Sequence, residues 1–342
     1  MSKTKVAVVG YGVIGQRLAD GVAAQADMEL VGIVDVAPTL SIRALFDSGS
    51  PYDLYVFDES QRASFEAEGF PVKGNLNDIL SKADIMLDAT PAGVGLKNKE
   101  IYKKAGKKAI FQGGEKNDVA DVFFHGYANY DKGIGKDYLK LTSCNTTGFI
   151  RAVDCIDKAV GVERVVATII RRTADPGDSH RGLVDVALVE KVPNHQAKDL
   201  MLIMPHIDAT GVLVHVPTTH GHIVTLLVTP KKRIEAADAI ALFETHPRIK
   251  VVDIAKGFNS NAAMFKYARE KGNKRADMYE IALFRETVVN SGDNLFFTIN
   301  IPQEAVVIPE TIDAIRASLS LQTDWRAGVA QTNKYLGMGD KA

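Results

Sequence analysis

The feature that most constrains the fold is a glycine cluster near the N-terminus. Gly10-Tyr-Gly12-Val-Ile-Gly15 follows directly after the apolar run Lys5–Val9 and opens the helical pattern Val13–Gln25. Glycines at these three places permit a tight turn, let a pyrophosphate approach the backbone, and allow a helix to pack closely on a strand. The unpaired N–H groups at the start of the helix favour an anion. The sequence therefore predicts a dinucleotide-binding strand-turn-helix unit in which Gly10, Gly12 and Gly15 contact the cofactor.

A carboxylate further along the chain supports this interpretation. Asp35 stands at the end of the next apolar run, Leu30–Val36, and follows Gly15 by 20 residues. This is the expected place for a carboxylate that binds the ribose 2′-OH. Because it would repel a 2′-phosphate, Asp35 favours NAD over NADP. The alternative interpretation is an ordinary glycine turn with a capping aspartate.

The pattern of strands and helices changes near residue 144. Before it, apolar strand runs such as Asp84–Thr90 and Lys108–Phe111 alternate with helical stretches, which is typical of an α/β, doubly wound Rossmann domain. After it come long β-rich runs with hairpin-like turns between them, and a few helices. We expect these to form an α+β catalytic domain with a mainly antiparallel sheet; the runs are Val165–Arg172, Val212–Thr219, Ile223–Thr229 and Leu295–Ile301.

The second motif is a cysteine at a predicted helix start. In Leu141-Thr-Ser-Cys144-Asn-Thr-Thr-Gly148 an apolar strand ends at residues that cap helices, and a helical pattern follows. A thiol at a helix N-terminus has a lowered pKa, and the N–H groups there, with the Asn145 amide, could hold an oxyanion. We interpret Cys144 as a nucleophile, the alternative being an inert buried thiol. Cys155 lies on the same predicted helix about 16 Å away, too far for a disulfide, and is expected to be packing.

A histidine cluster could supply the acid/base. His215, His220 and His222 lie in one segment, and strand alternation would place His220 and His222 on one face. His220 is the favoured acid/base because Pro217 and two threonines put it at a strand end. Zinc is the rival interpretation, but the spacing completes no convincing ligand set, so no metal is expected.

Basic residues end the run Val165–Arg172 and continue in the polar segment after it. They are suited to charge-assisted hydrogen bonds with phosphate groups, with a solvated basic loop as the alternative. The set comprises Arg171, Arg172, His180, Arg181, Lys191 and His195. The turn Gln112–Lys116 is a further place where backbone could pass close to a cofactor.

The overall charge excludes some partners. With 41 basic and 42 acidic residues the formal net charge is −1, so no general field attracts nucleic acid or a membrane surface. No apolar run approaches the roughly 18 residues of a membrane span, and the N-terminus carries no signal-peptide pattern. We expect a cytoplasmic protein.

These motifs together resemble the archaeal-type (type II) phosphorylating glyceraldehyde-3-phosphate dehydrogenases. The resemblance runs from end to end and is carried above all by Ser143-Cys-Asn-Thr-Thr-Gly148. It implies that Cys144 is the nucleophile, with the acid/base at His220; a segment shorter than the family's leaves His222 open for that role. It implies cofactor contacts by Val13, Ile14, Gly113, Arg171 and Gln303. Substrate contacts are implied for Ser143, Asn145, His195 and Gln196. We add Arg172 as a substrate contact because it belongs to the basic set described above.

The resemblance also implies a reaction and an assembly. The reaction is oxidation of D-glyceraldehyde 3-phosphate with NAD(P) and inorganic phosphate, through a thiohemiacetal and a thioester on Cys144, within glycolysis or gluconeogenesis. A homotetramer is implied, with a last helix that returns to the cofactor domain. The domains would then be 1–143 with 303–342 for NAD(P), and 144–302 for catalysis. Alternatives are an aspartate-semialdehyde-type dehydrogenase of the same layout, or a nucleotide-sensing protein without turnover.

Overall fold

The computed structural model describes residues 3–49, 51–112, 114–172, 187–218 and 220–339. The chain divides into two compact units. Unit 1 comprises Met1–Leu141 and Ile308–Leu336, and unit 2 comprises Thr142–Val307 and Gly337–Ala342. The segment Ile308–Leu336, near the C-terminus, thus belongs to the same unit as the first 141 residues. Each unit is built around its own eight-stranded sheet in the described part of the chain.

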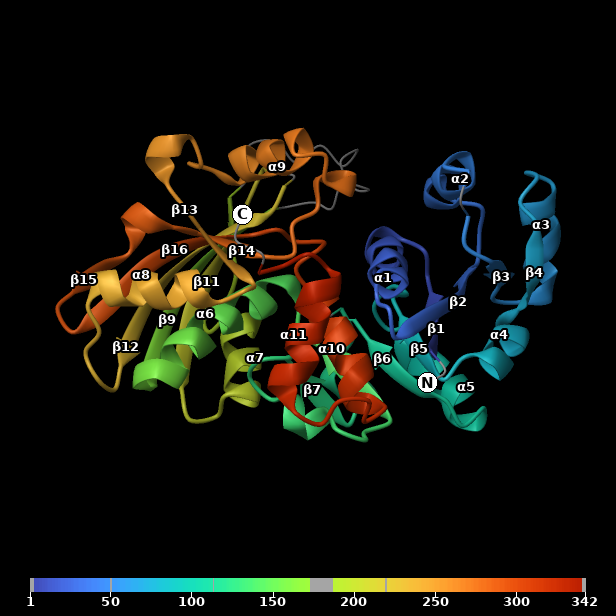
Figure 1. The fold of residues 1–342 in the computed structure, drawn as a ribbon, viewed down its shortest axis with the longest axis horizontal. Coiled ribbons are helices and arrows are strands. Elements are labelled where there is room, and N and C mark those ends of the chain that lie inside the picture. Colours follow the sequence, from blue (N-terminus) through green and yellow to red (C-terminus); the bar gives the residue numbers. More distant parts are fainter. Residues whose placement is uncertain (1–2, 50, 113, 173–186, 219, 340–342) are drawn as a thin grey trace. The chain divides into compact units, whose positions relative to one another are not determined.

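The sheet of unit 1 is parallel throughout, as the alternating pattern predicted (Figure 1). Its order is β4-β3-β2-β1-β5-β6-β8-β7, so the chain leaves β1 in one direction and returns on its other side at β5. A nucleotide site is expected outside the carboxyl ends of the strands at such a switch point. The strands are β1 (Thr4–Val9), β2 (Met28–Asp35), β3 (Leu54–Val56), β4 (Val72–Asn75), β5 (Ile85–Asp88), β6 (Lys108–Phe111), β7 (Val122–Phe124) and β8 (Tyr138–Leu141).

Helices cover this sheet and include two from the C-terminal part of the chain. These helices are α1 (Val13–Ala23), α2 (Leu40–Asp47), α3 (Arg62–Glu66), α4 (Leu76–Lys82), α5 (Gly95–Lys104), α10 (Ile308–Ser318) and α11 (Trp325–Tyr335). Every residue of α10 is buried. The side chain of Ile308 packs where Gly21 of α1 lacks a Cβ, at 2.7 Å from that position. Arg316 donates to Asp27 at 2.8 Å, which fixes α10 against the first βα unit.

The sheet of unit 2 is mixed, and the prediction of a mainly antiparallel sheet was wrong. β11 runs parallel to β9, and β13 runs parallel to β14, while the other pairs are antiparallel. The reason is that helices cross over between strands: α7 lies in the chain between β9 and β11, and α9 between β13 and β14. Parallel neighbours need such crossovers, which local turn signals do not reveal.

The elements of unit 2 place helices on both sides of its sheet. The strands are β9 (Val162–Arg172), β10 (Leu188–Val189), β11 (Asp208–Val216), β12 (His222–Pro230), β13 (Ile249–Val252), β14 (Ile281–Phe284), β15 (Val289–Ser291) and β16 (Asn294–Ile301), in the order β10-β11-β9-β12-β16-β14-β13, with β15 on β16. The helices are α6 (Cys144–Val160), α7 (His195–Ile203), α8 (Ala236–Thr245) and α9 (Asn261–Glu270). The position of a Cβ on Gly148 of α6 is 2.8 Å from the Ile301 side chain. Since side chains alternate along a strand, Asn300 faces the other side, where Met264 of α9 lies in the same lining.

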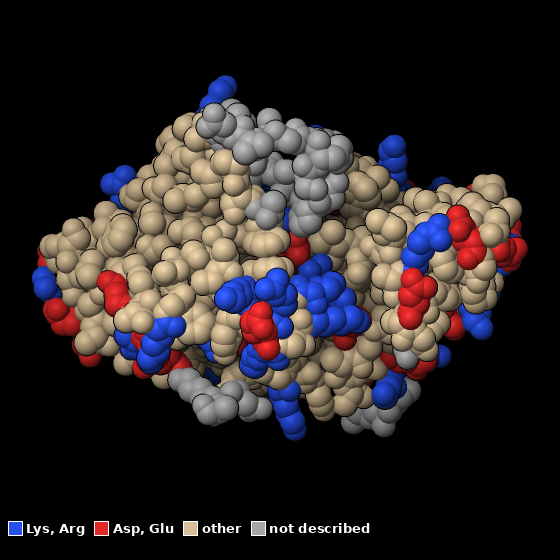
Figure 2. All heavy atoms as spheres, turned by 90° about the horizontal axis from the view of Figure 1, so that it is seen from above, with Lys and Arg blue, Asp and Glu red and all other residues tan. Residues whose placement is uncertain are grey.

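Two further features concern the charged side chains at the surface and the apolar character of the helices. On the face drawn in Figure 2 most of the surface is uncharged; some basic side chains gather in one cluster, and other charged side chains of both signs are scattered. Among the described residues, no helix has the length and apolar character to cross a bilayer.

Candidate active site

The start of α6 builds the first part of the site, as the sequence predicted. Ser143 is the N-cap residue, with extended backbone, and its hydroxyl accepts from the Thr146 N–H at 3.4 Å. Cys144 is the first helical residue and is partly exposed. A helix N-terminus presents unpaired N–H groups and positive potential, which favour a thiolate. Both described cysteines are free.

The histidine beside this thiol is His222. Its Nε2 lies 3.6 Å from the Cys144 Sγ, and its ring is fully buried as the first residue of β12. The Arg172 backbone N–H donates to His222 Nδ1 at 3.4 Å. Because Nδ1 accepts, a neutral imidazole carries its proton on Nε2, the nitrogen that faces the sulfur. Burial, aided by the charges of Arg171 and Arg172, holds the pKa of His222 well below its usual range.

His220 lies elsewhere in unit 2. Gly221 has φ +64°, in the left-handed region, so the segment is not extended and the expected shared face of His220 and His222 was wrong. The His220 ring stacks on Phe265 of α9 with centroids 3.9 Å apart, and its carbonyl accepts from Asn261. Of the two histidines that the sequence left open, the structure brings His222 to Cys144; an acid/base role for His220 stays a prediction.

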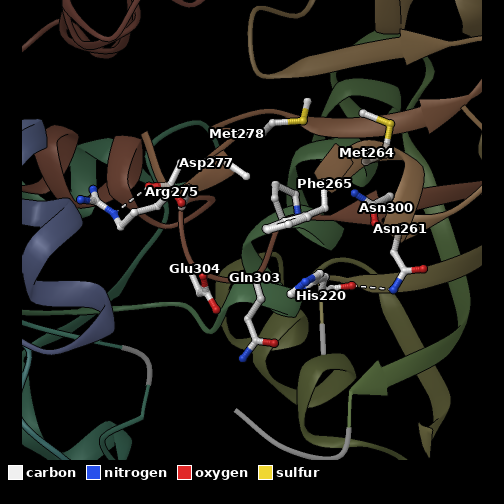
Figure 3. A pocket seen from close by; sticks show the side chains of 14 residues that line it. His220, Asn261, Met264, Phe265, Arg275, Asp277, Met278, Asn300, Gln303 and Glu304 are labelled. Atoms are coloured by element: carbon white, nitrogen blue, oxygen red, sulfur yellow. Dashed lines mark hydrogen bonds and ion pairs between the residues drawn. The ribbon is translucent and has the colours of Figure 1, made fainter. Parts of the chain in front are cut away.

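Figure 3 shows the pocket beside His220, which α9 and the segment after β16 line. The Phe265 ring lies against His220, and Gln303 and Glu304 lie to one side of His220. The buried Asn300 also lines this pocket, and its Oδ1 has no hydrogen-bond partner among the described residues. Sequence reasoning found Gln303 but missed Phe265 and Asn300, because these residues come together only through the sheet.

Helix α7 lies beside the start of α6. The Thr146 hydroxyl donates to Asp199 of α7 at 3.3 Å. His195 is the exposed first residue of α7, and Gln196 behind it is buried. Asn145 is also buried, and no described residue hydrogen-bonds its Oδ1. The structure therefore brings the start of α6 against α7 in unit 2, with four of the predicted substrate residues on or next to these two helices.

The predicted basic set is divided. Arg172 is almost fully buried and donates from Nη1 to Glu304 at 3.1 Å, and its predicted contact with the substrate stays a prediction. Arg171 is half-buried next to it, at the end of β9, in register with His215 of β11. His180 and Arg181 lie outside the described residues, as does Gly113 of the predicted cofactor contacts.

The glycine turn of unit 1 has the geometry that its motif predicted. Gly10 has φ +86°, and a Cβ on Gly15 would lie 1.8 Å from the Gly10 carbonyl oxygen. Gly12 is the N-cap of α1, has open space around its Cα, and provides no side-chain cap. The first N–H groups of α1, which belong to Val13, Ile14 and Gly15, could therefore hold a phosphate. Asp35 ends β2, and its carboxylate accepts from the Tyr11 N–H at 2.9 Å, which places it against this turn.

Apolar side chains at the same edge of the sheet were missed from the sequence. Five lie exposed on the segments that follow β1, β2 and β5: Val13 (39%), Val36 (55%), Leu40 (82%), Val94 (36%) and Leu96 (44%). Exposed apolar groups gathered at one edge indicate a ligand surface. Only Val36 directly follows a strand end, where polar turn residues are usual, so the sequence carried little local signal for the set.

No cluster of three or more His, Cys, Asp or Glu side chains suited to a metal ion occurs among the described residues. The groups described above that could take part in chemistry or binding are the thiol-imidazole pair of unit 2 and the phosphate-binding turn of unit 1.

Comparisons with known proteins agree with these two parts. A family profile described as "Glyceraldehyde 3-phosphate dehydrogenase, C-terminal domain" matches residues 143–272, and one described as "Dihydrodipicolinate reductase, N-terminus" matches residues 4–115. In fold, the chain is similar to aspartate semialdehyde dehydrogenase II from Vibrio cholerae, with TM-score 0.61, 16% identity, and 98% of this chain and 99% of that chain covered.

Full-length relatives are much more similar in sequence. Glyceraldehyde-3-phosphate dehydrogenase of Pyrococcus furiosus is 42% identical over 98% of this chain and 99% of the relative. The Methanoregula boonei enzyme of that name is 40% identical over 97% of each chain. Glyceraldehyde-3-phosphate dehydrogenase 2 of Methanosarcina barkeri is 38% identical over the full length of both. The chain belongs to the glyceraldehyde-3-phosphate dehydrogenase family.

Proposed function

We propose that the protein oxidises D-glyceraldehyde 3-phosphate to 1,3-bisphosphoglycerate, with NAD(P) as oxidant and inorganic phosphate as the second substrate. The observation that carries this proposal is the pair formed by Cys144 at the α6 N-terminus and His222 at 3.6 Å from it. A nucleophile and a proton-carrying imidazole in contact are the parts that covalent catalysis on an aldehyde needs. The names of the full-length relatives supply the substrate.

The first step is addition of sulfur to the carbonyl carbon. The helix N-terminus stabilises the Cys144 thiolate, and a C–S bond forms as the carbonyl oxygen gains negative charge. His222 carries its proton on Nε2, so it donates that proton to the oxygen to give the thiohemiacetal, and Nε2 is then free to take the proton back. N–H groups at the start of α6, with the Asn145 amide, are placed to share the charge on the oxygen.

The next two steps form a thioester and then release the Cys144 thiolate. Bound NAD(P) would supply the acceptor for the hydride that leaves the carbon. His222 Nε2 takes back the proton of the hydroxyl, and the product on Cys144 is a thioester. A phosphate oxygen then attacks the acyl carbon, the C–S bond breaks, and sulfur leaves as the thiolate that the helix stabilises. We assign the α7 N-terminus with His195 and Gln196 to the phosphate groups. Arg172, whose Nη1 also binds Glu304, is a further proposed contact to them.

Unit 1 is proposed to bind the cofactor. Its glycine turn and Asp35 fit the pyrophosphate and ribose of a dinucleotide, and Asp35 favours NAD. Gly113, Arg171 and Gln303 remain proposed contacts, and the division of the chain into 1–143 with 303–342, and 144–302, remains the proposed division of function. A homotetramer in the cytoplasm, with a role in glycolysis or gluconeogenesis, is part of the same proposal.

A steady-state assay tests the function. We expect NADH formation with D-glyceraldehyde 3-phosphate to depend on inorganic phosphate, and no such rate with aspartate semialdehyde. Cys144→Ser should abolish turnover but keep NADH binding, while Cys155→Ser serves as the matched control with normal turnover. Phosphate-independent turnover, or activity retained in Cys144→Ser, would contradict the proposal. A protein that binds NADH without any turnover would instead be a nucleotide sensor.

A further inference from the structure

Two buried carboxylates in unit 1 have no part in the chemistry described above. Asp88 is the last residue of β5, with 2% of its surface exposed, and Glu115 follows β6 with 8% exposed. Buried carboxylates are costly unless hydrogen bonds satisfy them. Both lie at the carboxyl edge of the parallel sheet. The chain reverses direction between β1 and β5, and β6 is the next strand beside β5.

Asp88 holds the beginning of the segment 89–95. Its Oδ1 accepts from the backbone N–H of Thr90 at 3.1 Å and also from the Thr90 hydroxyl. Its Oδ2 accepts from Asn98 Nδ2 at 2.8 Å and from the Tyr102 hydroxyl at 2.7 Å, both on α5. One carboxylate thus joins the end of β5, the segment that follows it, and the helix beyond.

Glu115 holds the other end of the same segment. Its Oε1 accepts from the Gly93 N–H at 2.9 Å and from the Gly95 N–H at 2.8 Å. A Cβ on Gly95 would lie 2.9 Å from that oxygen, so the approach depends on glycine. Glu115 comes from the turn after β6, which connects a second strand end to the segment.

The segment held in this way supports the glycine turn. The position of a Cβ on Gly10 is 3.0 Å from the Ala89 carbonyl oxygen and 3.1 Å from the Thr90 nitrogen. The backbone of 89–90 is therefore packed against the first glycine of the turn, on the side of the sheet's switch point. Exposed Val94 lies in the same segment.

We propose that Asp88 and Glu115 are positioning residues that hold segment 89–95 in the shape that receives the dinucleotide. The inference rests on the proposed binding of NAD(P) by unit 1. Neither carboxylate is expected to touch the cofactor, since their oxygens are turned to backbone and side-chain donors. Without them the segment samples other conformations, and the cofactor must restore the ordered one when it binds, which lowers its affinity.

Two isosteric variants and two matched controls test the proposal. The variants are Asp88→Asn and Glu115→Gln. Asp84→Asn is the first control: Asp84 precedes the same strand, is exposed, and accepts the Lys5 N–H at 2.8 Å at the opposite edge of the sheet. Glu286→Gln is the second control, because Glu286 accepts two backbone N–H groups, of Ile254 and Ala255, in unit 2.

The measurements are the NADH Kd by fluorescence titration, the KM values for NAD and aldehyde, kcat at saturating NAD, and the Tm. We expect the NADH Kd and the NAD KM to rise about tenfold in both variants, the effect of one charge-assisted hydrogen bond. The aldehyde KM and kcat should stay close to wild type, as should every constant of the controls. Thr90→Val removes a single hydroxyl bond to Asp88 and should raise the Kd in the same direction with an unchanged Tm.

The possible results separate the two levels of inference. A wild-type NADH Kd in Asp88→Asn, Glu115→Gln and Thr90→Val overturns the positioning role, even if the Tm falls. If Asp88→Asn does not fold, Glu115→Gln and Thr90→Val decide the question. A wild-type protein that binds no NADH refutes the proposed function instead.

Discussion

His222 and His220 provide a matched comparison, because the structure gives them different partners within one segment. The His222 Nε2 is 3.6 Å from the Cys144 Sγ, whereas the His220 ring stacks on Phe265 at 3.9 Å. Substitution of each by Asn keeps a polar side chain of similar width but removes the imidazole. We expect His222→Asn to lose turnover and His220→Asn to keep most of it.

The size of the difference follows from these contacts. A positioned acid or base contributes about 10²–10⁴-fold to a rate, so His222→Asn should lower kcat by at least about 100-fold, or about 2.7 kcal/mol of barrier. The lost stacking at His220 is worth about 0.5–1.5 kcal/mol of stability and has no direct effect on the barrier. For His220→Asn we therefore expect kcat to fall by less than about fivefold.

Initial rates of NADH formation at saturating substrates measure both variants, with melting curves as a check on folding. Alkylation of Cys144 by iodoacetamide separates the roles further, since loss of the Nε2–H should slow the reaction of the thiolate in His222→Asn alone. Equal losses in the two variants, or a larger loss in His220→Asn, would refute the assignment of proton transfer to His222.

Four further results are expected. Asp35→Ser should weaken NAD binding and raise the ratio of NADP to NAD activity; an unchanged ratio would show that this carboxylate is not the ribose ligand. Gly15→Ala should abolish NADH binding, because its Cβ would lie 1.8 Å from a carbonyl oxygen of the turn; binding by titration checks this. Arg316→Met should lower the free energy of unfolding by about 1–3 kcal/mol, since it removes the hydrogen bonds of a buried guanidinium to Asp27, Gln25 and Thr332; urea unfolding measures the loss, and unchanged stability would contradict it. The pKa of His222 is held well below its ordinary value near 6.5, so below that pH the unfolded chain binds a proton at this residue that the native protein does not bind. The free energy of unfolding should therefore be full above about pH 6.5 and fall as the pH drops below it. The substitution His222→Gln should flatten that part of the Tm-versus-pH curve.

Much of unit 1 could be predicted because its signals are local. The glycine turn needs only a strand, a helix start and backbone freedom at Gly10, all set by residues within about ten positions. The α6 N-terminus is similar: Ser143 caps the helix that begins at Cys144, and the run of Ser, Thr and Asn is sufficient to predict it. Apolar strands buried on both faces likewise indicated a parallel sheet.

The rest depends on which strands become neighbours. The mixed sheet of unit 2 follows from crossovers through α7 and α9, and local periodicity is the same for a strand in a parallel or an antiparallel pair. The choice between His220 and His222 depends on one backbone angle at Gly221 and on where α6 lies relative to β12. In the sequence, Asp88 is an ordinary acidic residue within a strand run and Glu115 one in a turn, and only tertiary structure brings both to segment 89–95.

The sequence by itself determined the chemistry that this protein can carry: a phosphate-binding turn, a helix-capped thiol, and histidines to move a proton. Tertiary structure alone decided which histidine faces the thiol, which arginine is held by a carboxylate, and which buried acids support the cofactor turn. The physical reason is the range of the forces involved. Turns and caps are set by dihedral preferences and hydrogen bonds between near neighbours, whereas pairing and burial arise from packing between segments far apart in the chain.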